Sequence, residues 1–239
     1  LSGYVVESLG LRRDVLAFDL VGQGCAAALP NMQLARSLIG SGAGRHVLSV
    51  CVEVSSAAMY LDNDPGVLIS ACLFGDGAGA AVLSAAPSDC LSAQHPDATG
   101  RSIEWHDSTS LTEPAHREAL RFEQRGGMLR NILTRQVPAL AADRAEEALR
   151  LVLGRAGLAQ EDIGAWILHA GGRDVLKAIE RSFGLGSEDL RYSADVLRRH
   201  GNLSSAFVYF VLDAALAGKA PGPWWWLSAF GAGFSCHGA

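Results

Sequence analysis

Short apolar runs and longer amphipathic stretches alternate along the first third of the chain. The run at 14–21 (DVLAFDLV) and the β-branched segment at 46–54 (HVLSVCVEV) predict buried strands. Segments 68–74 and 79–84, joined by the glycine turn GDGAG, predict a pair of strands. Between the first two strands, apolar residues from Cys25 to Ile39 recur with helical spacing and predict a helix.

The rest of the chain continues this alternation. Residues 85–115 are rich in Pro, Ser, Asp and Thr and predict a connection that contains one strand around Ile103. After it, the pattern predicts helices at 138–157, 173–184 and 204–218, a strand at 165–170 and two closing strands within 224–239. We therefore expect an α/β fold with buried strands, in which two halves share one plan.

Composition narrows the classes of function. Of 239 residues, 49% are hydrophobic and the net charge is only -5, which argues against disorder. The chain has no tract rich in Lys and Arg, so we expect no nucleic-acid partner. No apolar run reaches the roughly 18 residues of a membrane span, and the first residues do not resemble a signal peptide. Histidine and cysteine spacing predicts no metal site.

Two further observations concern the origin of the chain. Its five cysteines form an odd set without framework spacing, which predicts reduced thiols and a cytoplasmic location. Its first residue is Leu1 rather than Met, so we expect a processed protein or a part of a longer one.

Cys25 is the candidate nucleophile. It lies where a predicted strand ends at Gly22 and Gly24 and a helix begins. The start of a helix favours a thiolate over a thiol, and a glycine corner leaves the sulfur within reach, as a nucleophile elbow does for serine. Pro30 is expected to kink the first turn. The alternative is a cysteine buried for packing, which we expect for Cys51 and Cys72.

Two later segments supply candidate partners for this thiol. His169 ends a predicted strand and is followed at once by two glycines, a position that favours a cleft. Asn202 precedes an apolar helix, where it could instead serve only as an N-cap. Together the three residues form a possible nucleophile, base and hydrogen-bond donor.

Five motifs in this order, GQGCAAALPN, CLFGDGAGA, HAGGRDVL, HGNLSSA and FGAGF, resemble the type III polyketide synthases of the chalcone and stilbene synthase family. The nearest branch is the bacterial one that makes alkylpyrones and alkylresorcinols. The resemblance implies a thiolase-like fold of two similar α/β halves. The match begins inside the first half, which implies an N-terminally truncated member. Residues 1–86 would be the remainder of the N-terminal half with the cysteine, and 87–239 the C-terminal half with the histidine and asparagine.

The resemblance also implies an activity. Cys25 would carry an acyl group taken from an acyl-CoA starter, and malonyl-CoA would condense with it after losing carbon dioxide. His169 would hold the thiolate and, with Asn202, donate hydrogen bonds to the malonyl thioester oxygen. The product would be a pyrone, a resorcinol or a related polyketide. Coenzyme A thioesters would be substrates, no further cofactor would be needed, and the enzyme would be a homodimer.

The remaining assignments from the resemblance concern substrate binding. Phe74 matches a gatekeeper phenylalanine between the access tunnel and the cavity. Asn131 stands where plant members have a second gatekeeper phenylalanine. Three residues match positions along the pantetheine path or the initiation cavity: Gly171, Gly172 and Ser204. The glycine loop that shapes the active-site wall is matched by Phe230, Gly231 and Gly233.

Three alternatives remain open at this point. A ketoacyl synthase III-like enzyme of fatty-acid initiation shares Cys, His and Asn but has different neighbours around the last two. A thiolase-like fragment could be catalytically inactive. A cysteine hydrolase of the papain type also orders Cys, His and Asn along the chain.

Overall fold

The computed structural model describes residues 1–58, 63, 65–85 and 103–239. The helices and strands are, in chain order, α1 (Ser2–Ser8), α2 (Ala28–Gly40), β1 (His46–Glu53), α3 (Ser55–Ala58), α4 (Pro65–Leu73), β2 (Gly77–Ser84), β3 (Thr109–Thr112), β4 (Leu120–Arg125), β5 (Met128–Leu133), α5 (Val137–Ala156), β6 (Ile163–Leu168), α6 (Arg173–Phe183), α7 (Arg191–His200), α8 (Phe207–Ala217), β7 (Trp224–Gly231) and β8 (Ser235–Gly238).

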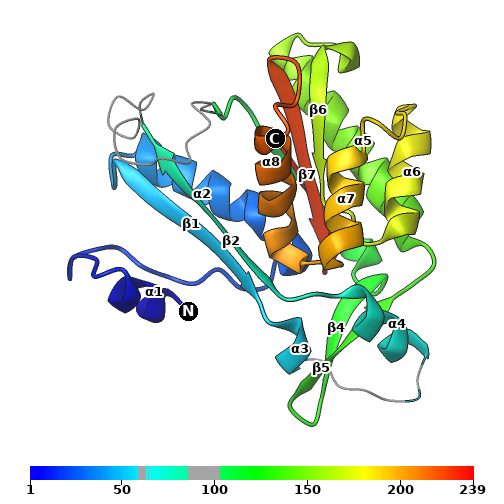
Figure 1. Ribbon diagram of the computed structural model, residues 1–239, viewed down its shortest axis with the longest axis horizontal. Coiled ribbons are helices and arrows are strands. Elements are labelled where there is room, and N and C mark those ends of the chain that lie inside the picture. The colour runs from blue at the N-terminus through cyan, green and yellow to red at the C-terminus, as the bar shows by residue number, and fades with distance from the viewer. Residues whose placement is uncertain (59–62, 64, 86–102) are drawn as a thin grey trace.

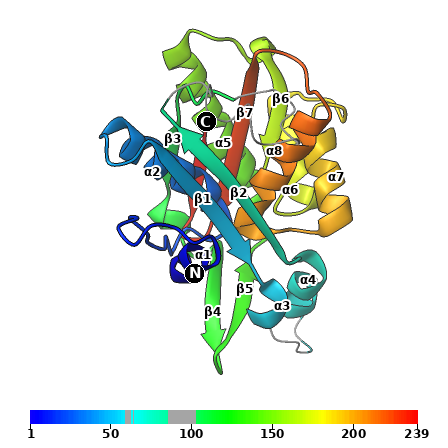
Figure 2. The same ribbon diagram turned by 60° about the vertical axis from the view of Figure 1, so that its left-hand side comes forward.

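The elements form layers. Strands β1 and β2 pair antiparallel as a two-stranded ribbon, and a sheet of order β3-β8-β7-β6 lies on the far side of α2 and α8 (Figures 1 and 2). Helix α2 contacts β1 and β2 on one side and β7 and β8 on the other, and α8 lies between β2 and β6–β7 in the same way. Helix α5 packs on β3, β7 and β8, with α6 beside it. The two helices between the sheets therefore hold the centre of the molecule.

Three strands of the four-stranded sheet, β6, β7 and β8, come from segments that the sequence pattern predicts as strands. Strand β6 pairs parallel with β7, whereas β7 with β8 and β3 with β8 are antiparallel. Trp226 is fully buried in β7, and Gly238 of β8 leaves room for its ring, since a Cβ there would lie 2.3 Å from the indole. Helix α5 ends at Gly157, whose left-handed φ of +67° closes it.

The β1–β2 ribbon packs against α8 at Tyr209. The hydroxyls of Ser49 and Tyr209 hydrogen bond at 2.7 Å, and both residues are buried. On the neighbouring strand β2, Gly79 lies under Tyr209. A Cβ added to this glycine would lie 2.5 Å from the Cβ of the tyrosine. A side chain at this glycine would push the ribbon away from the helix.

Most predicted elements are confirmed. The helices expected at 138–157, 173–184 and 204–218 and the strands expected at 46–54, 79–84 and 165–170 are present, as are both closing strands. Helix α2 begins at Ala28 rather than Cys25, after a 3-10 turn at Gly24–Ala26. Pro30 is thus its third residue, where a backbone N–H has no intrahelical acceptor, so no hydrogen bond is lost to it. The hydrogen-bond loss that was expected to kink the first turn therefore does not occur at Pro30.

Two strand predictions in the first third are wrong. Residues 14–21 form no strand and are exposed, and the Asp19 carboxylate instead accepts a hydrogen bond from the N–H of Ser2 at 2.9 Å. Segment 68–74 is mostly helical, because α4 begins at Pro65, a residue suited to a first helical turn. Strand β2 therefore pairs with β1, and Cys72 is exposed rather than buried.

In the connection, Ile103 lies in irregular structure, and the strand there is β3, which pairs with β8. The predicted boundary between residues 86 and 87 lies outside the described residues. The elements that were not predicted are α1, α3, α7 and the β4–β5 hairpin. The hairpin turns at Gly126 and Gly127, both with positive φ. Within the described ranges, no helix is long and apolar enough to cross a membrane. Those ranges likewise contain no group of three or more side chains able to hold a metal ion.

Candidate active site

Cys25 lies in the 3-10 turn that precedes α2, and it is buried. The corner before it depends on Gly22 and Gly24, with φ of +88° and +51°. Gly231, at the end of β7, packs directly on this corner, because a Cβ there would lie 2.3 Å from the carbonyl oxygen of Gln23. The predicted glycine loop therefore supports the cysteine turn by backbone contact.

His169 follows β6 immediately and is also buried. Its backbone N–H donates to the carbonyl of Ser228 on β7 at 2.8 Å, which continues the parallel pairing by one residue. The imidazole lies between the rings of Phe230, at 4.9 Å between centroids, and Phe207, at 5.5 Å. Gly171 adopts a φ of +58° just under Phe230, so the chain turns sharply after the histidine.

Asn202 joins the C-terminal part of the chain to the segment around Phe74. Its N–H donates to the carbonyl of Leu73 at 2.8 Å, and its carbonyl accepts from the N–H of Gly75 at 3.0 Å. These bonds form an isolated parallel bridge between Phe74 and Asn202. Gly75 permits this approach, because a Cβ there would lie 2.2 Å from the carbonyl oxygen of His200.

One hydrogen-bonded chain connects the three candidate catalytic residues. The Ser204 hydroxyl donates to Cys25 Sγ at 3.2 Å, and the Ser204 N–H donates to Asn202 Oδ1 at 2.9 Å. His169 Nε2 lies 3.0 Å from the same oxygen. Because a backbone N–H only donates, Oδ1 is the acceptor, and His169 must carry its proton on Nε2. Asn202 Nδ2 donates to the carbonyl of Gly171 at 3.3 Å.

The bond to the Ser204 N–H is an Asx turn, two residues on along the chain. Asn202 is not the N-cap of the following helix, since Leu203 precedes the 3-10 turn and Ala206 precedes α8, and its oxygen also holds His169. Ser204 has a φ of +52°, one of two such non-glycine values in the described residues. Strained backbone of this kind persists where the surroundings fix it, and here it directs the hydroxyl to the sulfur.

The protonation state of the site differs from the expectation. Burial raises the pKa of the Cys25 thiol to about 11, the Ser204 hydrogen bond opposes this, and the Glu53 charge adds to it. Burial also lowers the pKa of His169 to about 4. Both shifts oppose the expected thiolate in the resting site, because desolvation outweighs a helix N-terminus that begins three residues later, at Ala28.

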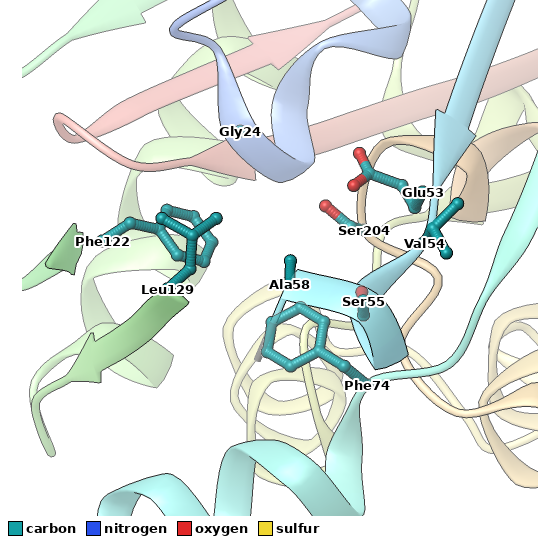
Figure 3. A pocket seen from close by; sticks show the side chains of 9 residues that line it. All are labelled: Gly24, Glu53, Val54, Ser55, Ala58, Phe74, Phe122, Leu129 and Ser204. Atoms are coloured by element: carbon teal, nitrogen blue, oxygen red, sulfur yellow. The ribbon is translucent and has the colours of Figure 1, made fainter. Parts of the chain in front are cut away.

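A cavity of about 210 Å³ opens beside the cysteine turn (Figure 3). Two predicted binding residues, Phe74 and Ser204, line it. The full lining consists of Gly24, Glu53, Val54, Ser55, Ala58, Phe74, Phe122, Leu129 and Ser204. Gly171, Gly172 and Phe230 belong to the histidine side of the site instead. Gly233, with φ +114°, donates to the carbonyl of Leu120 at 3.2 Å and so holds the glycine loop to the β4–β5 hairpin.

Several lining residues were not predicted from the sequence, among them Glu53, Phe122 and Leu129. Glu53 ends β1, and its carboxylate accepts hydrogen bonds from the N–H and the hydroxyl of Ser205. Phe122 and Leu129 come from the hairpin, on the side of the cavity away from Glu53 (Figure 3). A charged residue at the end of an otherwise apolar strand was the available signal for Glu53.

Comparison with known proteins places these residues in a family. The profile described as "Chalcone and stilbene synthases, C-terminal domain" matches residues 111–234, and the profile "FAE1/Type III polyketide synthase-like protein" matches residues 1–160. The 3,5-dihydroxyphenylacetyl-CoA synthase of Streptomyces toyocaensis is 30% identical over 218 residues, which are 90% of this chain and 55% of that enzyme.

Solved structures show the same fold. The type III polyketide synthase domain of Steely1 from Dictyostelium has a TM-score of 0.85 at 25% identity, covering 98% of this chain and 64% of that one. PKS-I from the brown alga Ectocarpus siliculosus has a TM-score of 0.85 at 26% identity, and the match covers 98% of this chain and 62% of that one. The tetrahydroxynaphthalene synthase of Streptomyces coelicolor has the same fold, with a TM-score of 0.83 at 23% identity. This match covers 99% of this chain and 65% of that one.

The chain therefore spans between 55% and 65% of the length of these relatives. The predicted α/β fold of the thiolase-like class is confirmed, with only part of the relatives' fold covered. The interpretation as a papain-type hydrolase is wrong, because both profiles and the fold belong to another group. The chain belongs to the chalcone and stilbene synthase family of type III polyketide synthases.

Proposed function

We propose that this protein condenses malonyl-CoA with an acyl-CoA starter to give a polyketide, with Cys25 as the acyl carrier. The observation that supports this best is the continuous chain of hydrogen bonds from Cys25 through Ser204 and Asn202 to His169. It brings a nucleophile, a base and an amide together, although His169 and Asn202 lie more than 140 residues from Cys25 along the chain, and Ser204, which connects them, lines the cavity. Acyl transfer through a thioester needs these groups together.

In the loading step, the Cys25 sulfur attacks the thioester carbonyl of the starter. The bond from that carbonyl to the coenzyme A sulfur breaks, and coenzyme A leaves as the thiol, with the proton that Cys25 gave up. The resting imidazole of His169 is neutral, with its pKa lowered to about 4 by burial, and we assign it the transfer of this proton. The product is an acyl group on Cys25.

In the extension step, malonyl-CoA loses carbon dioxide and becomes an enolate, whose negative charge gathers on the thioester oxygen. The Nε2–H of His169, which bonds Asn202 Oδ1 in the resting site, and the Nδ2 group of Asn202, which bonds the Gly171 carbonyl, are assigned as the two donors that turn to this charge as it develops. The enolate carbon then attacks the acyl group on Cys25. A carbon–carbon bond forms, the cysteine sulfur leaves, and the β-ketoacyl chain is held as a coenzyme A thioester.

The cavity next to Cys25 is assigned to the growing chain, with Phe74 at its margin as a gatekeeper. Gly171 and Gly172 are assigned to the pantetheine path, and the loop at 230–233 to the wall. Cys25 and Phe74 would come from the N-terminal half at 1–86, and the other catalytic residues from the C-terminal half at 87–239. The protein is proposed to act as a cytoplasmic homodimer.

The proposal is tested by intact-protein mass after incubation with acyl-CoA starters of graded length. The gene product that contains these 239 residues is compared with Cys25→Ala, and with Cys51→Ala as a matched control for loss of a buried thiol. We expect a gain of one acyl group, retained in the Cys51 variant and lost in the Cys25 variant. No gain with any starter would overturn the proposal and favour an inactive thiolase-like chain.

Extension is measured separately, by release of carbon dioxide from malonyl-CoA and by mass spectrometry of the products. Asn202→Asp removes one of the two donors but keeps an acceptor oxygen for His169 and Ser204, and it is expected to reduce decarboxylation while loading persists. The ketoacyl synthase alternative predicts a single extension, whereas a polyketide synthase adds several malonyl units. Products that never exceed one extension would therefore favour fatty-acid initiation.

A further inference from the structure

One polar group near the cavity has no partner that the structure accounts for. Asn131 is buried on β5, with 5% of its surface exposed, and its Oδ1 atom accepts no hydrogen bond from the described residues. Native proteins satisfy nearly all such atoms, so a buried carbonyl oxygen without a donor points to a missing ligand or water. It also destabilises the fold for as long as it is unpaired.

The hairpin places this amide on the cavity side. Asn131 lies directly opposite Phe122 in the antiparallel register, so both side chains project from the same face. Leu129 precedes it by two residues on β5 and therefore shares that face as well. Phe122 and Leu129 both line the cavity (Figure 3). The hairpin face toward the cavity thus carries two apolar side chains and one amide.

This face reaches the cysteine turn. A Cβ on Gly24, the residue before Cys25, would lie 3.8 Å from the ring of Phe122. A chain that grows from the Cys25 sulfur into the cavity meets Phe122 and Leu129 first. The amide of Asn131 lies next along the same face, at the cross-strand and two-residue spacing of a β-hairpin.

The unpaired atom is an acceptor, and this decides the ligand chemistry. A carbonyl oxygen needs an N–H or O–H donor. A saturated acyl chain held as a thioester has no N–H or O–H donor, whereas an extended poly-β-keto chain carries hydroxyls in its enol form and after it closes to a ring. A hydroxyl-bearing intermediate would satisfy Oδ1, and an unextended alkyl chain would not.

We propose that Asn131 is a positioning residue that accepts a hydrogen bond from an enol or ring hydroxyl of the extended chain. This proposal rests on the proposed function of the same site. Asn131 holds the chain in place for further extension and cyclisation, so its loss releases shorter products. It does not take part in loading of the starter.

The test compares Asn131→Leu, which has a similar size and no acceptor, with Asn131→Asp, which keeps an acceptor oxygen. Ile132→Val, on the opposite face of the same strand, is the control. With one alkyl starter, the ratio of fully extended to early-released products is measured by mass spectrometry. We expect this ratio to fall at least fivefold in the Leu variant, to be largely restored in the Asp variant and to be unchanged in the control. An unchanged ratio in the Leu variant would overturn the proposal.

A binding measurement separates this proposal from the proposed function. A small hydroxypyrone, 4-hydroxy-6-methyl-2-pyrone, is titrated while thermal unfolding is followed. It is expected to raise Tm in the wild type and the Asp variant but not in the Leu variant. Without the probe, the Leu variant is expected to unfold at a higher temperature than the wild type. A lower Tm would show that the carbonyl already has a structural partner, which contradicts the proposal. Failure of starter loading with this binding pattern intact would refute only the proposed function.

Discussion

Alkylation of Cys25 in the resting protein is expected to be slow, although the start of a helix usually activates a cysteine. Burial raises the pKa of this thiol to about 11, from an ordinary value of 9.0. Near pH 8, the thiolate fraction is then about 10⁻³, against roughly 10⁻¹ for an unshifted thiol. The shift alone should therefore slow reaction with iodoacetamide about a hundredfold relative to an unshifted cysteine.

Ser204 partly offsets this effect, because its hydroxyl donates to Cys25 Sγ and lowers the pKa. A hydrogen bond of about 0.5–1.5 kcal/mol corresponds to a change of roughly two- to tenfold in thiolate population. Ser204→Ala is thus expected to slow alkylation of Cys25 further by that factor. Ser37→Ala is the matched control, since that hydroxyl is exposed and bonds only within α2, to the carbonyl of Gln33.

The assay follows labelling from about pH 7 to pH 10, with digestion and mass spectrometry of the individual cysteine peptides. Cys72 is exposed and serves as a reference within the same molecule. We expect Cys25 to lag far behind Cys72 at neutral pH and to gain reactivity only as the pH rises. Labelling of Cys25 as fast as Cys72 near pH 7, or an apparent pKa below about 8, would refute the reasoning.

Three further predictions concern stability. Burial lowers the pKa values of His169 and His237 to about 4, so stability is full above pH 6.5 and falls between pH 6.5 and 4 as the unfolded chain alone binds protons. The loss of unfolding free energy reaches about 3 kcal/mol per histidine below that range. Urea midpoints of the wild type and of His237→Gln, measured from pH 7 to pH 4, test this. An equal loss of stability in the two proteins would argue against the prediction. Gly231→Ala is expected to cost about 1–3 kcal/mol by overpacking, whereas Gly154→Ala, with open space in α5, gains about 0.5–1 kcal/mol; shifts of Tm in the same direction would contradict this. Tyr209→Phe leaves a buried hydroxyl without its partner and is expected to cost about 1–3 kcal/mol, a claim that an unchanged urea midpoint would disprove.

The parts of the fold that the sequence predicted are those in which one pattern has one physical solution. Helices α5 and α6 carry an apolar face at helical spacing, and each buries that face against a neighbour. Strands β6 and β7 are apolar on both faces, as expected for strands covered on both sides. In such segments, local preference and tertiary burial favour the same structure.

The failures have a different origin. The runs at 14–21 and 68–74 are both short and apolar, and such runs do not distinguish a strand from a buried helix. The second is helical because Pro65 starts a helix, and the first has no strand partner in the described part of the chain. Pairing is a property of two segments, so no pattern within one segment can establish it.

The candidate site shows the same division. Motif order indicated Cys25, His169 and Asn202, and the structure connects them through Ser204. Phe122 and Leu129 could not be predicted, because they reach the cavity only through the direction in which the hairpin leaves the sheet. The high thiol pKa was equally hidden, since it follows from burial by segments distant in sequence.

The protonation states of Cys25 and His169 have a consequence for the order of events. Their pKa values, about 11 and about 4, differ by about 7, so moving the thiol proton to the imidazole costs of the order of 10 kcal/mol before the two charges attract each other. These shifts favour the neutral thiol and the neutral imidazole over a thiolate–imidazolium pair in the resting site. Under the proposed function, proton transfer is then coupled to attack on the acyl-CoA carbonyl, in which the sulfur gives up its charge as the thioester forms. This coupling keeps the thiol unreactive toward other electrophiles until a substrate is aligned, which is why slow alkylation and fast acyl loading are expected of the same cysteine.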